Sequence, residues 1–159
     1  MCIRDSYKSV GILLERSEAH ESNRNVVIET EKTDTTDGKG NPLYASDTSV
    51  AVSIEDPYAG IRSIEWSVNA PYDTGNNRNG IVTVDNNGAI SDEAWKITTA
   101  DRNLVTGVSG QIPVFHNSND IVVNVKVTDC AGNVTEKAVT ISIDKTAPEI
   151  SISYNLSLI

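Results

Sequence analysis

The chain has 159 residues, with 13 Lys and Arg against 22 Asp and Glu, which gives a formal net charge of −9. This length suits a single domain with flanking segments. The negative balance argues against a nucleic-acid-binding protein, which needs a basic surface to displace counterions from phosphates. No run of the sequence approaches the roughly 18 apolar residues of a membrane-spanning helix.

Alternation of apolar and polar side chains marks the predicted strands, because every second residue of a strand faces the same side of a sheet. A first, weaker strand is expected at residues 26–30. Pro57 and Gly60 indicate a turn between the next two strands. The inward faces of these two strands are expected to consist of Val50, Val52, Ile54, Ile64, Trp66 and Val68.

The middle of the chain gives weaker strand signals. Short strands are predicted at residues 81–84, 95–98 and 111–115, and stretches rich in Asp, Asn and Gly separate them. The region 71–119 is long for such a fold and is expected to carry extra loops. No amphipathic helix of useful length interrupts the pattern, which favours a β-sandwich or barrel.

The clearest pattern is a β-hairpin near the C-terminus. Its inward residues are expected to be Val123, Val125, Val127, Val139 and Ile141. In the loop between the two strands, Gly132 can supply a positive φ and Asp129 can accept backbone N–H groups of its own turn.

The hairpin also carries a family resemblance. Residues 127–135 read Val-Thr-Asp-Cys-Ala-Gly-Asn-Val-Thr, and residues 143–148 read Ile-Asp-Lys-Thr-Ala-Pro. Both stretches resemble the end of a bacterial immunoglobulin-like repeat. The resemblance implies an all-β, immunoglobulin-like antiparallel sandwich over residues 26–144, a linker at 145–149, and the start of a following repeat at 150–155. Trp66 would then be the Trp that such sandwiches commonly bury on their third strand.

The two ends of the chain do not fit this pattern. Residues 1–6 resemble the translated sequencing-adapter peptide that begins open reading frames from metagenomic assemblies, and residues 156–159 resemble the start of another copy. We expect both to be non-native and the rest to be a fragment, with residues 7–25 an unassigned flank. Only Cys130 would then be a native cysteine, so an intrachain disulfide is not expected and Cys130 is interpreted as an exposed thiol.

Enzyme signatures are missing from the sequence, so no catalytic residue is nominated. His20 and His116 lie in polar, loop-like contexts and are interpreted as solvated side chains. An intramolecular isopeptide bond, which some surface immunoglobulin-like modules form, would need Lys and Asn in the core. Lys126 and Asn124 are instead predicted to point outward.

Calcium is the one cofactor that the sequence suggests. In a sandwich of this topology, the loops that hold Glu55, Asp56 and Asp129 emerge at the same end, and carboxylate oxygens are suitable ligands for this ion. The alternative is that Asp129 caps its own turn and the other acids are solvated. Asp144 is expected at the opposite end.

The leading functional hypothesis is a non-catalytic structural spacer: one immunoglobulin-like repeat of a larger secreted or surface-attached bacterial protein, with neighbouring repeats as its partners. The alternative is a recognition module that binds a glycan or a host surface protein through Tyr58, Tyr72 and Trp95, although Trp95 is expected to be a second core or edge-strand residue rather than a stacking platform. A third reading is an accessory domain of a polysaccharide-degrading enzyme. The expected location is extracellular or at the cell surface.

Overall fold

The computed structural model describes residues 25–85 and 87–154. Their regular structure consists of strands and one short 3-10 turn, η1 (Thr74–Asn76). The strands are β1 (Asn25–Thr30), β2 (Leu43–Tyr44), β3 (Thr48–Glu55), β4 (Ile61–Asn69), β5 (Arg78–Thr83), β6 (Trp95–Asp101), β7 (Leu104–Val114), β8 (Ser118–Asp129) and β9 (Val134–Ile143). Within the described residues, no helix is long and apolar enough to cross a membrane.

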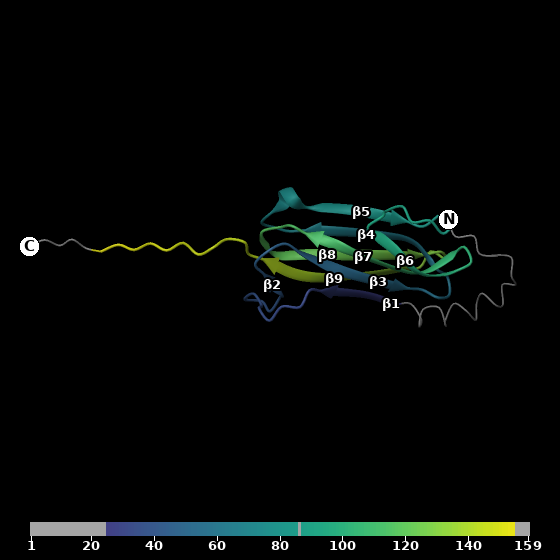
Figure 1. The fold of residues 1–159 in the computed structure, drawn as a ribbon, viewed down its shortest axis with the longest axis horizontal. Helices are drawn as coiled ribbons and strands as arrows, with labels where there is room; N and C mark the ends of the chain where they lie inside the picture. The colour runs from purple at the N-terminus through teal and green to yellow at the C-terminus, as the bar shows by residue number, and fades with distance from the viewer. Residues whose placement is uncertain (1–24, 86, 155–159) are drawn as a thin grey trace, which may run out of the picture.

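The strands form two packed sheets (Figure 1). One has the order β1-β3-β7-β6 and the other β2-β9-β8-β4-β5. All pairings are antiparallel except that of the two-residue β2 with β9. If β1, β3, β4, β6, β7, β8 and β9 are lettered A to G, the sheets are ABED and GFC, extended by β5 and β2. This is the strand order of an immunoglobulin sandwich, so the predicted fold class is confirmed.

Every strand expected from the sequence is present, and the largest differences from the prediction are one additional strand and one much longer strand. The short β2 was not expected, because two residues are too few to show an alternation. β7 begins at Leu104 rather than near residue 111. The alternation did not reveal this first part of the strand, because Gly107 and Gly110 interrupt its apolar pattern. Both glycines face side chains of β6: a Cβ on Gly107 would lie 2.3 Å from the Thr99 hydroxyl.

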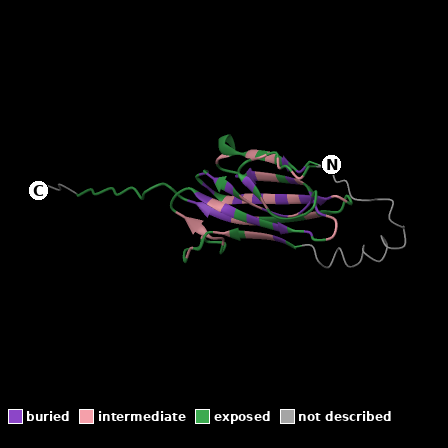
Figure 2. Ribbon diagram, turned by 45° about the vertical axis from the view of Figure 1, so that its right-hand side comes forward, coloured by how far each residue is buried: buried purple, intermediate pink, exposed green. Residues whose placement is uncertain are grey.

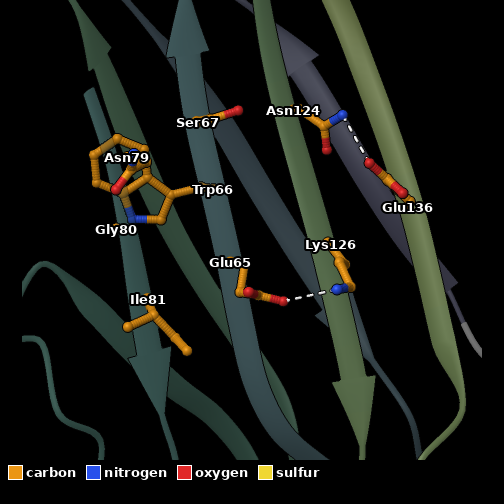
Figure 3. A pocket seen from close by; sticks show the side chains of 9 residues that line it. All are labelled: Glu65, Trp66, Ser67, Asn79, Gly80, Ile81, Asn124, Lys126 and Glu136. Carbon is orange, nitrogen blue, oxygen red and sulfur yellow. Dashed lines mark hydrogen bonds and ion pairs between the residues drawn. The ribbon is translucent and has the colours of Figure 1, made fainter. Parts of the chain in front are cut away.

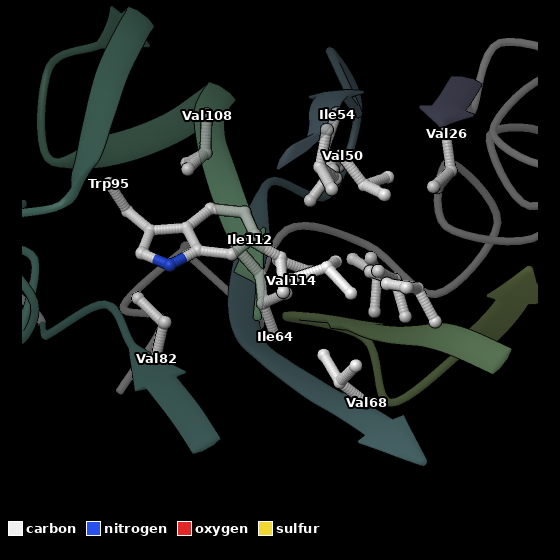
Figure 4. Packing of buried hydrophobic residues seen from close by; sticks show 14 of the residues in the cluster. Val26, Val50, Ile54, Ile64, Val68, Val82, Trp95, Val108, Ile112 and Val114 are labelled. Carbon is white, nitrogen blue, oxygen red and sulfur yellow. The ribbon is translucent and has the colours of Figure 1, made fainter. Parts of the chain in front are cut away.

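The core lies between the two sheets (Figure 4). Nine of the eleven side chains predicted to face inward are at most 2% exposed, namely Val50, Val52, Ile54, Ile64, Val68, Val123, Val125, Val127 and Ile141. The other two, Trp66 and Val139, pack against the core but are only partly buried. Alternation therefore identified the inward face correctly and did not show which positions lie at its rim.

The two tryptophans are buried to different extents. Trp95 is 2% exposed and lies in the core, whereas Trp66 is half-buried, so the prediction of Trp66 as the core Trp is wrong. Each indole lies over a glycine of the neighbouring strand: a Cβ on Gly110 would approach the Trp95 ring to 2.4 Å, and one on Gly80 the Trp66 ring to 2.6 Å. Because β5 is an edge strand, Trp66 lies at the open side of the sandwich.

Arg78 of β5 covers that open side. Its guanidinium lies 5.5 Å from the centroid of the Trp66 ring and 4.6 Å from that of Phe115, both cation–π distances. It also donates a hydrogen bond to the carbonyl of Pro113, on the opposite sheet. Arg78 thus joins the two sheets where no strand closes the gap.

Three turns share one motif, an Asp followed three positions later by a Gly with φ between 75° and 92°. In each turn the Asp Oδ1 accepts N–H groups of the second and fourth residues after it, at 2.8–3.0 Å. The acids are Asp37, Asp85 and Asp129. The prediction that Asp129 caps its own turn is confirmed, and the same sequence signal was present at the other two.

The chain enters and leaves the sandwich at opposite ends (Figure 1). Asn25 begins β1 opposite Glu55, at the end that carries the β3–β4 and β8–β9 loops. Ile143 ends β9 opposite Ser118, at the end that carries the β4–β5 and β7–β8 loops. We call these the entry end and the exit end. After β9 the chain runs away from the sandwich as an exposed segment, and Ile150 and Ile152 are 84% and 88% exposed (Figure 2).

Candidate functional site

The predicted calcium ligands lie together at the entry end. The Cys130 N–H donates to the Gly60 carbonyl at 3.0 Å, which places the β8–β9 loop beside the β3–β4 loop as expected. The side chains differ in exposure, however. Asp56 and Asp129 are each 1% exposed, whereas Glu55 is exposed at the end of β3.

The oxygens of Asp129 are occupied by its own turn. Oδ1 accepts the N–H groups of Ala131 and Asn133 at 2.9 and 2.8 Å, and Oδ2 accepts the side-chain amide of Asn133 at 3.2 Å. Asp56 Oδ1 accepts the Ala59 N–H at 3.2 Å. Among the described residues, no group of three or more His, Cys, Asp or Glu side chains could hold a metal ion. Calcium binding stays a prediction, and this geometry gives it no support.

The aromatic residues proposed for ligand stacking do not form one surface. Tyr58 is half-buried in the β3–β4 loop at the entry end, while Tyr72 is 75% exposed in the β4–β5 loop at the exit end. Trp95 is in the core and cannot offer a ring face to a ligand, so its assignment as a binding residue is wrong. A single Trp in a polar segment gives no sequence signal that separates core from surface.

A shallow depression lies on the outer face of the five-stranded sheet (Figure 3). Its volume is about 540 Å³, and it is lined by Glu65, Trp66, Ser67, Asn79, Gly80, Ile81, Asn124, Lys126 and Glu136. The charged groups in it pair with neighbours on the same sheet: Lys126 lies 3.1 Å from Glu65, and the Asn124 amide donates to Glu136 at 2.9 Å. Lys126 and Asn124 thus lie on the outer face as predicted, away from the core.

The exit end holds a denser cluster of polar contacts, which the sequence did not reveal. Lys145, two residues after β9, donates from its backbone N–H to Asn117 Oδ1 at 3.0 Å. Its Nζ donates to the Phe115 carbonyl at 2.7 Å and forms an ion pair with Asp47. The Asn117 amide donates to the Thr146 hydroxyl at 3.2 Å. We call Asp47, Phe115, Asn117, Lys145 and Thr146 the exit cluster.

Two further hydrogen bonds support the exit cluster from neighbouring segments. The Asn117 N–H donates to Asp73 Oδ2 at 2.8 Å, and this bond, with that from the Asn76 amide, lowers the pKa of Asp73. The Asp144 N–H donates to the Tyr44 carbonyl at 2.9 Å. The first residues after β9 are therefore tied to the β7–β8 loop, the β2–β3 loop and strand β2.

His116 lies within this end of the molecule and is fully buried, so its interpretation as a solvated side chain is wrong. Its Nε2 lies 3.3 Å from Asn77 Oδ1, which also accepts the Ala70 N–H at 2.7 Å. Its Nδ1 is buried and has no hydrogen-bond partner. Burial lowers the pKa of His116, and the positive charges of Arg78 and Lys145 lower it further, against the opposing effects of Asp73 and of a hydrogen bond with the Asn76 backbone.

The prediction for Cys130 is contradicted, and several other predictions fall on residues that the structure does not describe. Cys130 is disulfide-bonded in the structure, so its interpretation as a free thiol is wrong. His20 lies outside the described residues, as do the segments 1–6, 156–159 and nearly all of 7–25.

No family model matches this chain, and no curated protein matches it. Among solved structures, it is similar to a DUF4466 family protein from Parabacteroides merdae, with 9% identity over 77% of this chain and a TM-score of 0.39. It spans only 45% of that protein's length. It is also similar to murine CRIg, with 15% identity over 76% of this chain and 99% of that one, and a TM-score of 0.35. At such TM-scores neither likeness carries an argument, and the description as immunoglobulin-like rests on the strand order.

Proposed function

We propose that this chain is a non-catalytic structural spacer, one immunoglobulin-like repeat of a larger secreted or surface-attached bacterial protein. The observation that carries the proposal is that the chain enters and leaves the sandwich at opposite ends (Figure 1). Modules connected in this way add their lengths in series. A module whose ends lay side by side would fold the array back on itself.

The segment after β9 also supports this role. Ile150, Ile152 and Tyr154 alternate with serines and are 78–88% exposed, so they contribute nothing to the core of this sandwich. Exposed apolar residues at strand spacing favour a strand that belongs to another sheet. In the proposed array, that sheet is part of the following repeat.

The experiment is small-angle X-ray scattering on the protein with a folded reporter domain fused to each terminus. A spacer should hold the reporters apart by at least the length of the sandwich, with a single maximum in the distance distribution. Reporters that lie side by side, or distances spread evenly over all values, would contradict the proposal. In parallel, glycan-array binding that is lost in Tyr72→Ala would favour the alternative of a recognition module.

A further inference from the structure

The exit cluster fixes the first residues of the linker to the body of the sandwich. Lys145 is held at both its backbone N–H and its Nζ, by Asn117 and Phe115 respectively. The Thr146 N–H donates to Asp144 Oδ1 at 2.9 Å, and its hydroxyl accepts the Asn117 amide. Because these contacts point in different directions, they restrict the orientation of the chain as well as its position.

Both anchors of Lys145 flank His116 in the sequence. Phe115 supplies the carbonyl that accepts from Nζ, and Asn117 supplies the side-chain oxygen that accepts from the backbone N–H. The imidazole of His116 points into the protein and is fully buried. Any movement of His116 out of its site must therefore displace the two residues that hold the linker.

Burial, rather than the hydrogen bond to Asn77, is what favours the neutral ring of His116. Asn77 Oδ1 already accepts the Ala70 N–H, so it acts as an acceptor and His116 Nε2 carries the hydrogen. Protonation would add an N–H at Nδ1, a buried atom that has no hydrogen-bond partner in the structure, and the backbone of Asn76, which favours the charged ring, outweighs neither burial nor the nearby cations. A buried donor without an acceptor is costly, and a buried charge is more so.

The charged groups around His116 come from three elements. Arg78 of β5 and Lys145 of the linker oppose a positive charge on the ring, whereas Asp73 in the β4–β5 loop favours it. Asp73 already accepts hydrogen bonds from Asn117 and Asn76. Two cations and one committed carboxylate leave a protonated ring without a dedicated counterion among these groups.

We propose that Lys145 and His116 form a pH-responsive latch, which fixes the direction of the linker at neutral pH and releases it when His116 takes up a proton. On protonation the ring leaves its buried site, Phe115 and Asn117 move with it, and Lys145 loses these two anchors and keeps only its partly exposed ion pair with Asp47. The latch rests on the proposed spacer function, since it would turn a rigid junction into a flexible one. Lys145 and His116 act here as positioning residues.

The test is ¹⁵N relaxation of the linker amides in the full chain, measured from about pH 8 to about pH 4.5, a range that brackets the usual histidine pKa of about 6.5. At the upper limit, Lys145 and Thr146 should have order parameters near 0.85, as in rigid backbone, and on acidification these should fall below about 0.6. The imidazole ¹⁵N shifts of His116 in the same samples should titrate with the same midpoint.

Two variants and one control show whether His116 and Lys145 cause the loss of linker order. His116→Gln keeps a donor for Asn77 and cannot titrate, so its linker should stay ordered over the whole range. In Lys145→Met the linker amides should be disordered at every pH. The control Lys137→Met, at an exposed site on β9, should behave like the unsubstituted protein. The wild-type titration decides the matter even if His116→Gln fails to fold.

Three results would overturn the latch: a linker that stays ordered while His116 protonates, a linker that is disordered at pH 8, or loss of order that persists in His116→Gln. None of these results affects the scattering test at neutral pH unless the linker is disordered there. In that case widely separated reporters would still support a spacer with a flexible joint. The two proposals can therefore fail separately.

Discussion

At the entry end, Asp56 and Asp129 accept hydrogen bonds from residues no more than four positions away in the sequence. At the exit end, Lys145 bonds to residues 28 and 30 positions earlier, and Asp73 accepts from a residue 44 positions later. These entry-end carboxylates therefore cap their own loops, which the hydrogen bond from the Cys130 N–H to the Gly60 carbonyl joins to each other, whereas the exit-end side chains connect segments far apart in the sequence. We expect substitutions at the two ends to differ in what they disturb.

The largest loss of stability is expected for a substitution in the core, which both ends share. Trp95→Ala removes a fully buried indole and leaves a cavity, so the free energy of unfolding should fall by about 3–5 kcal/mol. The matched substitution Trp66→Ala, at the rim, should cost no more than about 2 kcal/mol. Urea unfolding monitored by circular dichroism gives both values. Equal losses would mean that the two indoles are buried alike.

At the entry end, Asp129→Ala should lower the free energy of unfolding by about 2–3 kcal/mol, because it removes a buried acceptor and leaves the N–H groups of Ala131 and Asn133 without their partner. Asp85→Ala is the matched control, since it breaks the same turn motif at an exposed site and should cost about 1 kcal/mol or less. Equal losses of stability in the two variants would mean that the burial of Asp129 does not strengthen its contribution.

At the exit end, stability should fall on acidification. The pKa of His116 is below its usual value in the folded state, so below about pH 6.5 the unfolded chain binds a proton that the folded protein resists. The contribution is fully present above that pH and is lost as the pH falls toward the folded-state pKa. Thermal melts of the wild type and His116→Gln should therefore diverge below about pH 6.5. Parallel curves would show that His116 does not titrate in a buried site.

The smallest effect on stability is expected for Lys145→Met. Its side chain and that of Asp47 are 33% and 55% exposed, and ion pairs this exposed contribute about 1 kcal/mol or less. The melting temperature should therefore change little, while the linker amides lose their order. A large loss of global stability would mean that the exit cluster belongs to the folding core.

This contrast also explains how much of the structure was predictable from the sequence. The hairpin of β8 and β9, its inward valines and the cap at Asp129 follow from local patterns, because period-2 alternation and turn chemistry operate over a few residues. The entry-end loops also meet where the topology requires. The expected metal ligands do not form a site there, because Glu55 is exposed and the oxygens of Asp129 bond to its own turn.

The failures all involve contacts between distant segments. Trp66 and Trp95 both lie at inward positions, yet Trp95 on the edge strand β6 is buried and Trp66 on the interior strand β4 is less so, which no local pattern indicates. His116 has polar neighbours in the sequence, yet Asn77 and Arg78 come from another loop and strand to cover it. The linker residues were identified by resemblance alone, and nothing local indicated that Lys145 reaches back to Phe115.

The claim that the exit direction is fixed can be tested most directly by residual dipolar couplings of the backbone amides in a weakly aligned sample at neutral pH. The alignment tensor is determined from the strand residues of the sandwich. The couplings of Lys145 and Thr146 should fit that tensor as well as those of β9 do, whereas Ile150 and Ile152 should show couplings averaged toward zero. If the couplings of Lys145 and Thr146 are averaged in the same way, the linker leaves the sandwich in no fixed direction and the account of the exit cluster is wrong.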